Sequence, residues 1–330
     1  PTEFEICLYH DHTTEDAVSA RLRSHAALWR NFAGQSPAVV ERVIRADKPD
    51  ILIDLAGHIG STIRLPVLAR RLAPVQVTYL GYPDTTGVAA MDYRFTDAIA
   101  DPVGGSERYH TEQLVRFAPT AWSYLPPNEA PAVAPLPGIN GGRVTYGCFN
   151  NPTKFTDGLF VVWARLLERV PAARLLLKGR DFEDASVREQ LLARMRAQGI
   201  PLERLELLPR TADTAGHLAL YAQVDIALDT FPYAGTTTTC EALWMGRPVV
   251  TLSGSRHASR VGASLLTALG RPEWIAQNPE SYVEIAARLA SRLSDVANSS
   301  SQLRDQMRAS VLCDHEAHAQ AFAAGLRGCW

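Results

Sequence analysis

Residues 144–179 read VTYGCFNNPTKFTDGLFVVWARLLERVPAARLLLKG. The runs 146–150 and 174–178 within this stretch are strand-like, and the second stops at Gly179. Between the two runs, apolar side chains recur at helical spacing, at Leu159, Trp163, Leu166, Leu167 and Val170. A strand, a helix and a second strand in this order predict two parallel strands of one sheet.

The same alternation continues along the rest of the chain. Further strands are predicted at 205–208, 225–229 and 249–252, with helices between them and mostly helix after Leu252. This pattern favours an α/β fold with a doubly wound parallel sheet. Because ligands bind beyond the carboxyl ends of the strands in such sheets, we expect the chemistry in the loops that follow these strands.

The first third of the chain shows a similar alternation, with strand-like runs at 51–55 and 75–80. The stretch 119–143 is rich in proline and glycine, which cannot maintain a helix or a central strand. We therefore predict a first lobe over 1–118, a linker over 119–143 and a second lobe over 144–330.

Composition excludes several classes of function. The chain has 330 residues, 33 Lys+Arg against 35 Asp+Glu and a formal net charge of −2, so no global basic field indicates a nucleic-acid or anionic membrane partner. It has no run of about 18 apolar residues, so no membrane span is predicted. Its 5 cysteines are scattered without a C-x-x-C pair, which argues against a disulfide scaffold or zinc ribbon and favours the cytoplasm.

The loop between one predicted strand and the next helix reads DTFPYAGTTTTCE at 229–241. Gly235 allows a tight turn there, and the threonines 236–239 suit a helix start. Free N–H groups, hydroxyls and the positive end of a helix dipole together favour a bound phosphate. An alternative is a helix N-cap with more hydroxyls than it needs. Glu241 lies one turn into the helix, where it either accepts from ribose hydroxyls or complements the helix dipole.

This loop, together with CFNNPTK at 148–154 and LGYPDTTG at 80–87, resembles the O-GlcNAc transferase/SPINDLY family of protein glycosyltransferases. Further matching stretches occur in the same order along the chain, at 50–57, 71–76, 91–93 and 259–261. The resemblance implies a GT-B-type architecture of two Rossmann-like doubly wound lobes. The first lobe is expected to be incomplete at its N-terminus, because a histidine-bearing strand and loop of the family precede the first residues of this chain. Tetratricopeptide repeats usually precede the family's lobes, and none is visible here.

The resemblance also implies roles for individual residues. Lys154 matches the lysine that stabilises the leaving diphosphate, and a solvated surface lysine is the alternative. Thr237 and Thr238 match the residues that hold phosphate oxygens, and Glu241 matches the acid on the ribose. His217 matches a histidine beside the nucleotide, with an ordinary helix-face histidine as the alternative.

The predicted site thus has two parts. The residues implied to bind the nucleotide sugar are Asn151, Lys154, Arg210, Thr211, His217, Gly235, Thr236, Thr237, Thr238 and Glu241. Those implied on the sugar and acceptor side are Leu80, Gly81, Tyr82 and Pro83. His58 follows the strand 51–55 and is a second catalytic candidate beside Lys154.

No metal or cofactor is expected. The sequence has no Asp-x-Asp motif, and a lysine with a helix N-terminus can stabilise a leaving diphosphate by itself. The histidines in HDH at 10–12 and HEAH at 315–318 lack the spacing of a metal-binding helix and suit surface positions.

The resemblance implies inverting transfer of a sugar to Ser or Thr hydroxyls of a protein or peptide acceptor. UDP-GlcNAc is the favoured donor. GDP-fucose, the donor of SPINDLY-like O-fucosyltransferases, is an alternative, because Thr236 and Glu241 stand where hexosamine-transferring members more often carry His and Asp. A non-catalytic nucleotide-sugar-binding module and a glycan or lipid acceptor are further alternatives.

Overall fold

The computed structural model describes residues 3–60 and 64–330, so the predicted start of the first lobe at residues 1–2 lies outside the described residues. The chain divides into two compact units. Unit 1 comprises Pro1–Thr96, Glu107–Val115 and Ala323–Trp330, and unit 2 comprises Asp97–Ser106 and Arg116–Phe322.

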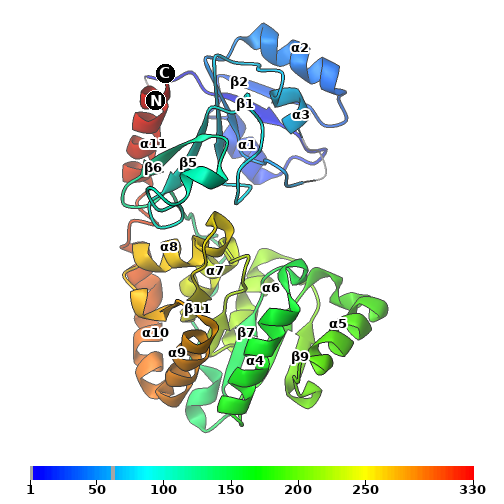
Figure 1. Ribbon diagram of the computed structural model, residues 1–330, viewed down its shortest axis with the longest axis vertical. Coiled ribbons are helices and arrows are strands. Elements are labelled where there is room, and N and C mark those ends of the chain that lie inside the picture. Colours follow the sequence, from blue (N-terminus) through cyan, green and yellow to red (C-terminus); the bar gives the residue numbers. More distant parts are fainter. Residues whose placement is uncertain (1–2, 61–63) are drawn as a thin grey trace. The chain divides into compact units, whose positions relative to one another are not determined.

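Unit 2 is built on a six-stranded sheet in the order β12-β11-β10-β7-β8-β9, with parallel neighbours throughout. Its strands are β7 (Thr145–Cys148), β8 (Arg174–Lys178), β9 (Leu205–Leu208), β10 (Ile226–Leu228), β11 (Val249–Leu252) and β12 (Ile275–Ala276). The chain starts in the middle at β7, fills β8 and β9 on one side, and then crosses to β10 on the other side (Figure 1). The loops after β7 and β10 therefore flank the point where the strand order reverses, the usual ligand position in such sheets.

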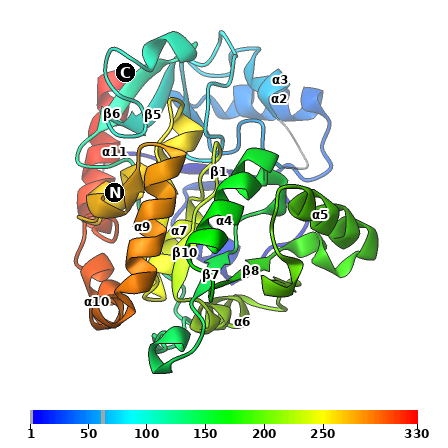
Figure 2. The ribbon, with the colours of Figure 1, turned by 60° about the horizontal axis from the view of Figure 1, so that its bottom comes forward.

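Helices cover both faces of this sheet. They are α4 (Asp157–Arg169), α5 (Ala185–Ala197), α6 (Thr214–Ala219), α7 (Thr237–Trp244), α8 (Val261–Ala268), α9 (Pro279–Ser291) and α10 (Leu293–Arg308). Leu175 and Leu177 of β8 pack in one core cluster with α4, α5 and α9, and Leu176 packs in a second cluster with α6, α7, α8 and α10. This alternation follows from the two-residue period of a strand. Figure 2 shows α4 and α9 side by side on their face.

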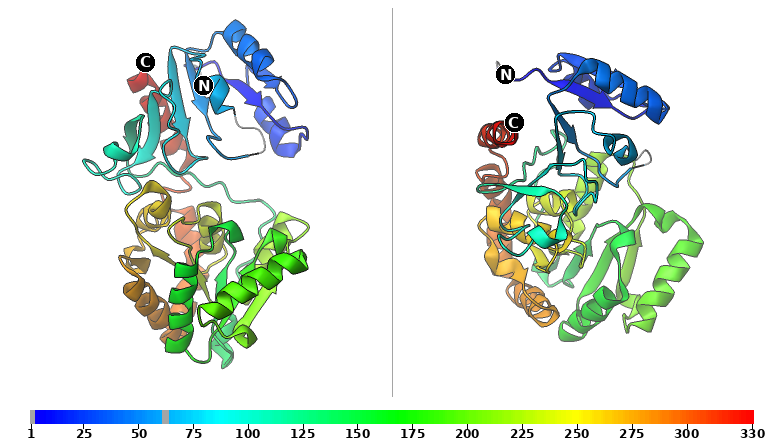
Figure 3. Two further views of the ribbon diagram at one scale, coloured as in Figure 1. Left: turned by 45° about the vertical axis from the view of Figure 1, so that its right-hand side comes forward. Right: turned by 45° about the horizontal axis from the view of Figure 1, so that its top comes forward.

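Unit 1 holds a four-stranded sheet in the order β3-β4-β5-β6 and a separate parallel pair, β1-β2. Its strands are β1 (Cys7–His10), β2 (Leu28–Asn31), β3 (Ile51–Asp54), β4 (Val75–Tyr79), β5 (Tyr93–Asp97) and β6 (Gln113–Phe117). The last residue of β5 and the last two of β6 are counted with unit 2. Its helices are α1 (Ala17–Arg23), α2 (Pro37–Asp47) and α3 (Leu65–Leu68). Val40 and Ile44 of α2 pack with Phe32, which directly follows β2, and Figure 3 shows α2 alongside the β1-β2 pair. Helix α11 (His315–Cys329) contributes residues to both units.

The predicted α/β class with parallel strands is confirmed, and the strands predicted at 174–178, 205–208 and 249–252 match β8, β9 and β11 residue for residue. Helix α3 is short, and Arg71 adopts a left-handed backbone conformation (φ 48°) between this helix and β4.

The stretch predicted as a linker, 119–143, lies within unit 2 and packs on it. Trp122 Nε1 donates to Ser264 Oγ at 3.0 Å, and Arg304 Nη2 donates to the Pro131 carbonyl at 2.7 Å. This stretch forms the short 3₁₀ helix η2 (Pro137–Asn140), and side chains of unit 2 bind its backbone carbonyls. Unit 2 also includes Asp97–Ser106, which lie inside the predicted first lobe.

None of the helices in the described part of the chain combines the length and the apolar composition needed to cross a membrane.

Candidate nucleotide-sugar site

A buried carboxylate organises the loop that follows β10. Asp229 is 1% exposed, and its Oδ1 accepts the backbone N–H groups of Thr230 (2.9 Å) and Gly235 (2.6 Å). Its Oδ2 accepts the hydroxyl of Thr251, the third residue of β11, at 2.7 Å. Burial raises the pKa of Asp229, while these hydrogen bonds and the nearby Lys154 charge act in the opposite direction. The carboxylate thus fixes the path of the backbone from β10 to α7.

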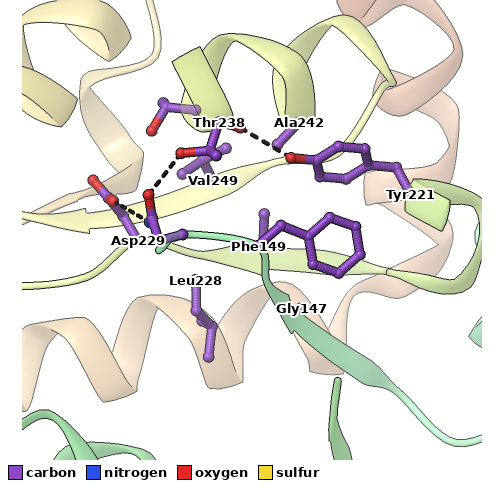
Figure 4. A pocket seen from close by; sticks show the side chains of 11 residues that line it. Gly147, Phe149, Tyr221, Leu228, Asp229, Thr238, Ala242 and Val249 are labelled. Atoms are coloured by element: carbon purple, nitrogen blue, oxygen red, sulfur yellow. Dashed lines mark hydrogen bonds between the residues drawn. The ribbon is translucent and has the colours of Figure 1, made fainter. Parts of the chain in front are cut away.

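Asn150, two residues after β7, ties this loop to the neighbouring strand. Its Nδ2 donates to Asp229 Oδ1 at 3.1 Å, and its Oδ1 accepts the Thr238 hydroxyl at 2.6 Å. Figure 4 shows these bonds together with that from the Tyr221 hydroxyl to the Thr238 carbonyl, which measures 3.2 Å. Strand ends on both sides of the reversal point therefore share one polar network with the first turn of α7.

Position 235 requires glycine, because side-chain oxygens of neighbouring residues approach its Cα closely. A Cβ at this position would lie 2.6 Å from Asn150 Oδ1 and Thr238 Oγ1 and 2.9 Å from Thr239 Oγ1. Any larger residue would push the network apart, so the glycine allows α7 to start directly against the end of β7.

Lys154 ends the short 3₁₀ helix η3 (Pro152–Lys154) that follows β7. Its Nζ donates to the Ala234 carbonyl at 2.7 Å and lies 3.8 Å from the centre of the Tyr233 ring. Burial lowers the pKa of Lys154, and the negative charge of Asp229 opposes that shift. The ammonium group is therefore held on the loop that leads into α7, three residues before the helix begins.

The first turn of α7 is the second feature that suits an anion. Thr236 stands at the N-cap, but its side chain makes no capping hydrogen bond. The Thr238 hydroxyl is bonded to Asn150 instead. The alternative in which the threonines serve chiefly as caps is therefore wrong for these two residues. Thr237 is exposed and Thr236 is half-buried, so both are accessible to a ligand at the positive end of the helix dipole.

A small pocket lies at the carboxyl ends of β7 and β10, beneath α7 (Figure 4). The lining residues are Gly147, Phe149, Asn150, Tyr221, Ala227, Leu228, Asp229, Thr238, Thr239, Ala242 and Val249. Of the predicted site residues, only Thr238 lines it.

Glu241 and His217 are brought into direct contact. Glu241 Oε2 lies 3.0 Å from His217 Nε2, with both side chains less than one-fifth exposed. On its other side, the ring nitrogen Nδ1 of His217 lies 2.8 Å from Nζ of Lys178, the last residue of β8. The Phe149 and Tyr221 rings lie 5.9 and 5.8 Å from the His217 ring centre.

Three further predicted residues lie at the margin of this cluster. Arg210 is exposed, and its charge contributes to lowering the pKa of Lys178. The Thr211 hydroxyl donates to the Asp213 carbonyl at 3.3 Å. Asn151 is exposed, and its side chain accepts the Thr153 N–H at 3.1 Å to cap η3, so this oxygen serves a local structural role.

The residues predicted on the sugar and acceptor side gather in unit 1, where β3 and β4 end side by side. Leu80 has φ 70° and is 43% exposed, and Pro83 is buried. A Cβ on Gly81 would lie 2.0 Å from the Leu55 carbonyl oxygen, so only glycine fits. The Tyr82 ring centre lies 4.8 Å from that of His58.

His58 lies in this group and is exposed. Its Nε2 lies 2.9 Å from the Thr86 carbonyl oxygen. A carbonyl only accepts, so Nε2 carries a proton and Nδ1 of the neutral ring is left as an acceptor.

The sequence-based prediction missed Asn150, Asp229 and Lys178 as side chains that shape the site. Asp229 directly follows β10, Asn150 lies two residues after β7, and Lys178 is a charged residue closing an apolar strand. That position is the signal that would have found all three, because the carboxyl ends of neighbouring parallel strands share one edge of the sheet. Among the described residues, no group of three or more His, Cys, Asp and Glu side chains is placed to hold a metal ion.

Comparison with known proteins identifies the family. The sequence profile of glycosyl transferase family 41 matches residues 35–123 and 137–322. The chain belongs to glycosyl transferase family 41. The predicted relationship to the O-GlcNAc transferase/SPINDLY proteins is thereby confirmed.

Curated relatives of this family 41 chain carry both family names. The probable UDP-N-acetylglucosamine–peptide N-acetylglucosaminyltransferase SPINDLY of Solanum lycopersicum is 41% identical over 333 residues, which is 100% of this chain and 36% of the relative. The protein named SEC from Arabidopsis thaliana is 30% identical over 280 residues, 82% of this chain and 28% of the relative. The chain therefore spans about a third of the length of these relatives.

Solved structures agree with the fold. A mutant of the Thermobaculum terrenum O-GlcNAc transferase is 36% identical and superimposes with a TM-score of 0.90, covering 99% of this chain and 61% of that one. HepE of Anabaena, solved with UDP and glucose, is 13% identical with a TM-score of 0.58, covering 97% of this chain and 91% of that one, and supports the fold alone. The predicted GT-B architecture of this family 41 member is confirmed.

Proposed function

We propose that this chain transfers a sugar, with inversion, from a nucleotide-sugar donor to Ser or Thr hydroxyls of a protein or peptide acceptor, without a metal. The observation that carries this proposal is the position of Lys154. Its Nζ is held 2.7 Å from the Ala234 carbonyl, on the loop that delivers the first turn of α7 to the reversal point of the sheet.

The chemistry that this arrangement offers is stabilisation of a leaving diphosphate. As the bond between the anomeric carbon and the diphosphate oxygen breaks, negative charge develops on the phosphate. The Lys154 ammonium, the N–H groups of the first α7 turn and the accessible hydroxyls of Thr236 and Thr237 can neutralise that charge. Because Asp229 and Asn150 already fix the loop, little reorganisation is needed when the charge appears.

The nucleoside lies, in this proposal, along the edge formed by the strand ends of β8 and β9. Glu241 accepts from the ribose hydroxyls, His217 lies beside the nucleotide, and Arg210 and Thr211 lie next to the base. Asn151 and Gly235 shape the backbone around the diphosphate. The contact between Glu241, in the second turn of α7, and His217 supports this assignment, because it joins the two side chains that we propose to face the nucleoside.

The acceptor hydroxyl attacks the anomeric carbon opposite the leaving group, so its oxygen forms the new glycosidic bond while the diphosphate departs with the old one. Leu80, Gly81, Tyr82 and Pro83 provide the sugar and acceptor side. His58 takes the hydroxyl proton at Nδ1, the nitrogen left as an acceptor when Nε2 donates to Thr86.

UDP-GlcNAc is the donor that we favour. The names of the relatives, SPINDLY and SEC alike, specify UDP-N-acetylglucosamine. GDP-fucose is the second candidate, because Thr236 and Glu241 follow the SPINDLY pattern and the SPINDLY relative from Solanum lycopersicum is 41% identical over 100% of this chain.

Calorimetric titration of the chain with UDP and with GDP tests the proposal. We expect one of the two to bind, and we expect Lys154→Met to weaken that binding at least tenfold. Binding of neither nucleotide, or unchanged binding by the variant, would contradict the proposal. Binding of UDP in preference to GDP supports UDP-GlcNAc, and the reverse preference supports GDP-fucose. Tight nucleotide binding without transfer to any peptide would instead indicate the non-catalytic module.

Other expectations stay predictions. The full-length protein is expected to carry N-terminal tetratricopeptide repeats, and the cytoplasm is its expected location. The absence of a cofactor is likewise a prediction, which transfer activity in the presence of EDTA would support.

A further inference from the structure

Three ionisable side chains from three elements form a line at the edge of the unit 2 sheet. Lys178 closes β8, His217 lies in α6 and Glu241 lies in α7. The distance from Lys178 Nζ to His217 Nδ1 is 2.8 Å, and that from His217 Nε2 to Glu241 Oε2 is 3.0 Å. Both ring nitrogens of His217 therefore have a partner, a lysine ammonium at Nδ1 and a carboxylate at Nε2.

The donor inventory of these groups fixes where the protons lie. A lysine ammonium has three donors and no acceptor, so His217 Nδ1 must accept from it. An imidazole that accepts at Nδ1 carries its single proton at Nε2. That proton points at a carboxylate oxygen, so His217 is neutral and donates to Glu241.

The surroundings of Lys178 support this arrangement. Burial lowers the pKa of Lys178, while the negative charge of Glu241 raises it and the positive charge of Arg210 lowers it. Lys178 is half-buried, so part of its ammonium hydration is lost, and the His217 lone pair supplies a hydrogen-bond acceptor in its place. The Phe149 and Tyr221 rings lie 5.9 and 5.8 Å from the His217 ring and limit its rotation.

We propose that Lys178 is a positioning residue for ribose recognition, acting on Glu241 through the tautomer of His217. With His217 Nε2 bonded to Oε2, the Glu241 carboxylate is held with its second oxygen, Oε1, as the acceptor for a ribose hydroxyl. Without the ammonium at Nδ1, the ring can also adopt the tautomer that carries its proton there. His217 then presents a lone pair to the carboxylate, and Glu241 loses its orientation. This inference rests on the proposed function, since it assigns a nucleotide ribose to Glu241.

Two nucleotides that differ only in the ribose separate this role from a merely structural one. In the wild-type chain, we expect UDP to bind about tenfold more tightly than 2′,3′-dideoxy-UDP, a difference of about 1.4 kcal/mol. In Lys178→Met, the two should bind with nearly equal affinity. Lys178→Arg retains a charged donor and should keep most of the preference. Arg180→Met removes an exposed positive charge two residues away and serves as the matched control. The same comparison is made with GDP and 2′,3′-dideoxy-GDP.

Nitrogen-15 NMR of histidine-labelled chain gives a readout that needs no ligand. We expect His217 to be protonated at Nε2 alone in the wild type and in Lys178→Arg, and to populate both tautomers in Lys178→Met. A wild-type ring protonated at Nδ1, or an unchanged ribose preference in a folded Lys178→Met, would overturn the inference. If the wild type binds none of the four nucleotides, the proposed function fails, and the tautomer still decides whether Lys178 controls His217.

Discussion

The loops that follow β10 in unit 2 and β4 in unit 1 start from the same place, the carboxyl end of a buried parallel strand. The first wraps around Asp229 and runs directly into α7. The second, residues 80–87, is held by Arg94, which donates to the Tyr82 and Asp84 carbonyls, and leads to β5 without a helix.

A buried carboxylate fixes each loop, but with different consequences. Glu112 accepts from the Thr86 N–H at 2.7 Å and from the Thr85 hydroxyl at 2.7 Å. In the unit 2 loop, the carboxylate leaves a helix N-terminus and a lysine for an anion. In the unit 1 loop, it leaves an aromatic ring, a histidine and the exposed Leu80. In the proposed function, the same position in the fold therefore binds a charged diphosphate in one unit and an uncharged hydroxyl acceptor in the other.

The largest expected effect comes from Lys154→Met. Removing one group that stabilises a developing charge typically lowers kcat by about 10²- to 10³-fold. Folding should be little affected, because methionine fills similar space and burial already disfavours the lysine charge. Steady-state rates of transfer to a peptide measure the fall in kcat, and the thermal unfolding midpoint shows whether folding is affected. Lys48→Met, at the C-cap of α2 in unit 1, is the matched control and should retain full activity.

Substitution of Gly81 and of Gly235 by alanine compares the rigidity of the two loops. In Gly81→Ala, the new Cβ would meet backbone atoms, with the Leu55 carbonyl oxygen at 2.0 Å. In Gly235→Ala, it would meet side-chain atoms of Asn150, Thr238 and Thr239, which can move. We expect losses of about 3 kcal/mol for Gly81→Ala and about 1–2 kcal/mol for Gly235→Ala.

Denaturant unfolding measures both losses, with Gly158→Ala as a control, since its Cβ has an atom only at 4.0 Å. Equal tolerance of the substitutions at 81 and 235 would show that the unit 1 loop is no more rigid than its counterpart. Nucleotide binding should weaken in Gly235→Ala alone.

His58→Ala tests the division of labour between the loops. We expect about a tenfold fall in transfer rate, a modest effect because water can take the acceptor proton at an exposed site. The affinity for UDP and GDP should stay unchanged, because the residues that we propose to bind the diphosphate belong to unit 2. If His58→Ala loses nucleotide affinity to the same extent as activity, the proposed separation of nucleotide binding in unit 2 from acceptor chemistry in unit 1 is wrong.

The smallest expected effect is a difference in how Glu112 and Asp229 change the stability of the fold as the pH falls. Burial raises the pKa of Glu112, but hydrogen bonds from Thr86 and Thr85 outweigh it and leave the pKa lowered. The stability that Glu112 contributes is therefore complete above its unfolded-state pKa and is lost as the pH falls through its folded-state pKa. Asp229 has a raised pKa, so its charge costs stability above that pKa, and this cost is relieved as the pH falls.

Urea unfolding between pH 3 and 7 separates the two signs. Relative to the wild type, Glu112→Gln should lose less stability on acidification, and Asp229→Asn should lose more. Shifts in the same direction for both variants would show that the two carboxylates play equivalent roles.

Much of the fold was accessible from the sequence, because apolar runs such as 174–178 and 249–252 have lengths and neighbours that only parallel strands explain. The path of 119–143 could not be predicted, because proline content argues against long helices and strands but does not indicate how a segment packs. Its packing depends on contacts made by Arg304 and Trp122.

The candidate site likewise has a part that the sequence predicts and a part that it does not. Lys154 and the threonine loop are adjacent to strand ends in the sequence, and both meet at Ala234. The contact of Lys178 with His217 joins residues 39 positions apart. A propensity or motif for either residue alone does not predict it, because only the order of β8 beside β7 and the position of α6 bring them together.

A crystal structure of the chain with UDP bound would show whether Lys154 and the start of α7 hold the diphosphate. We expect phosphate oxygens within hydrogen-bond distance of Lys154 Nζ and of the backbone N–H groups at the start of α7, with the ribose at Glu241. A diphosphate bound elsewhere on unit 2, with Lys154 still bonded to the Ala234 carbonyl and the first turn of α7 unoccupied, would contradict it.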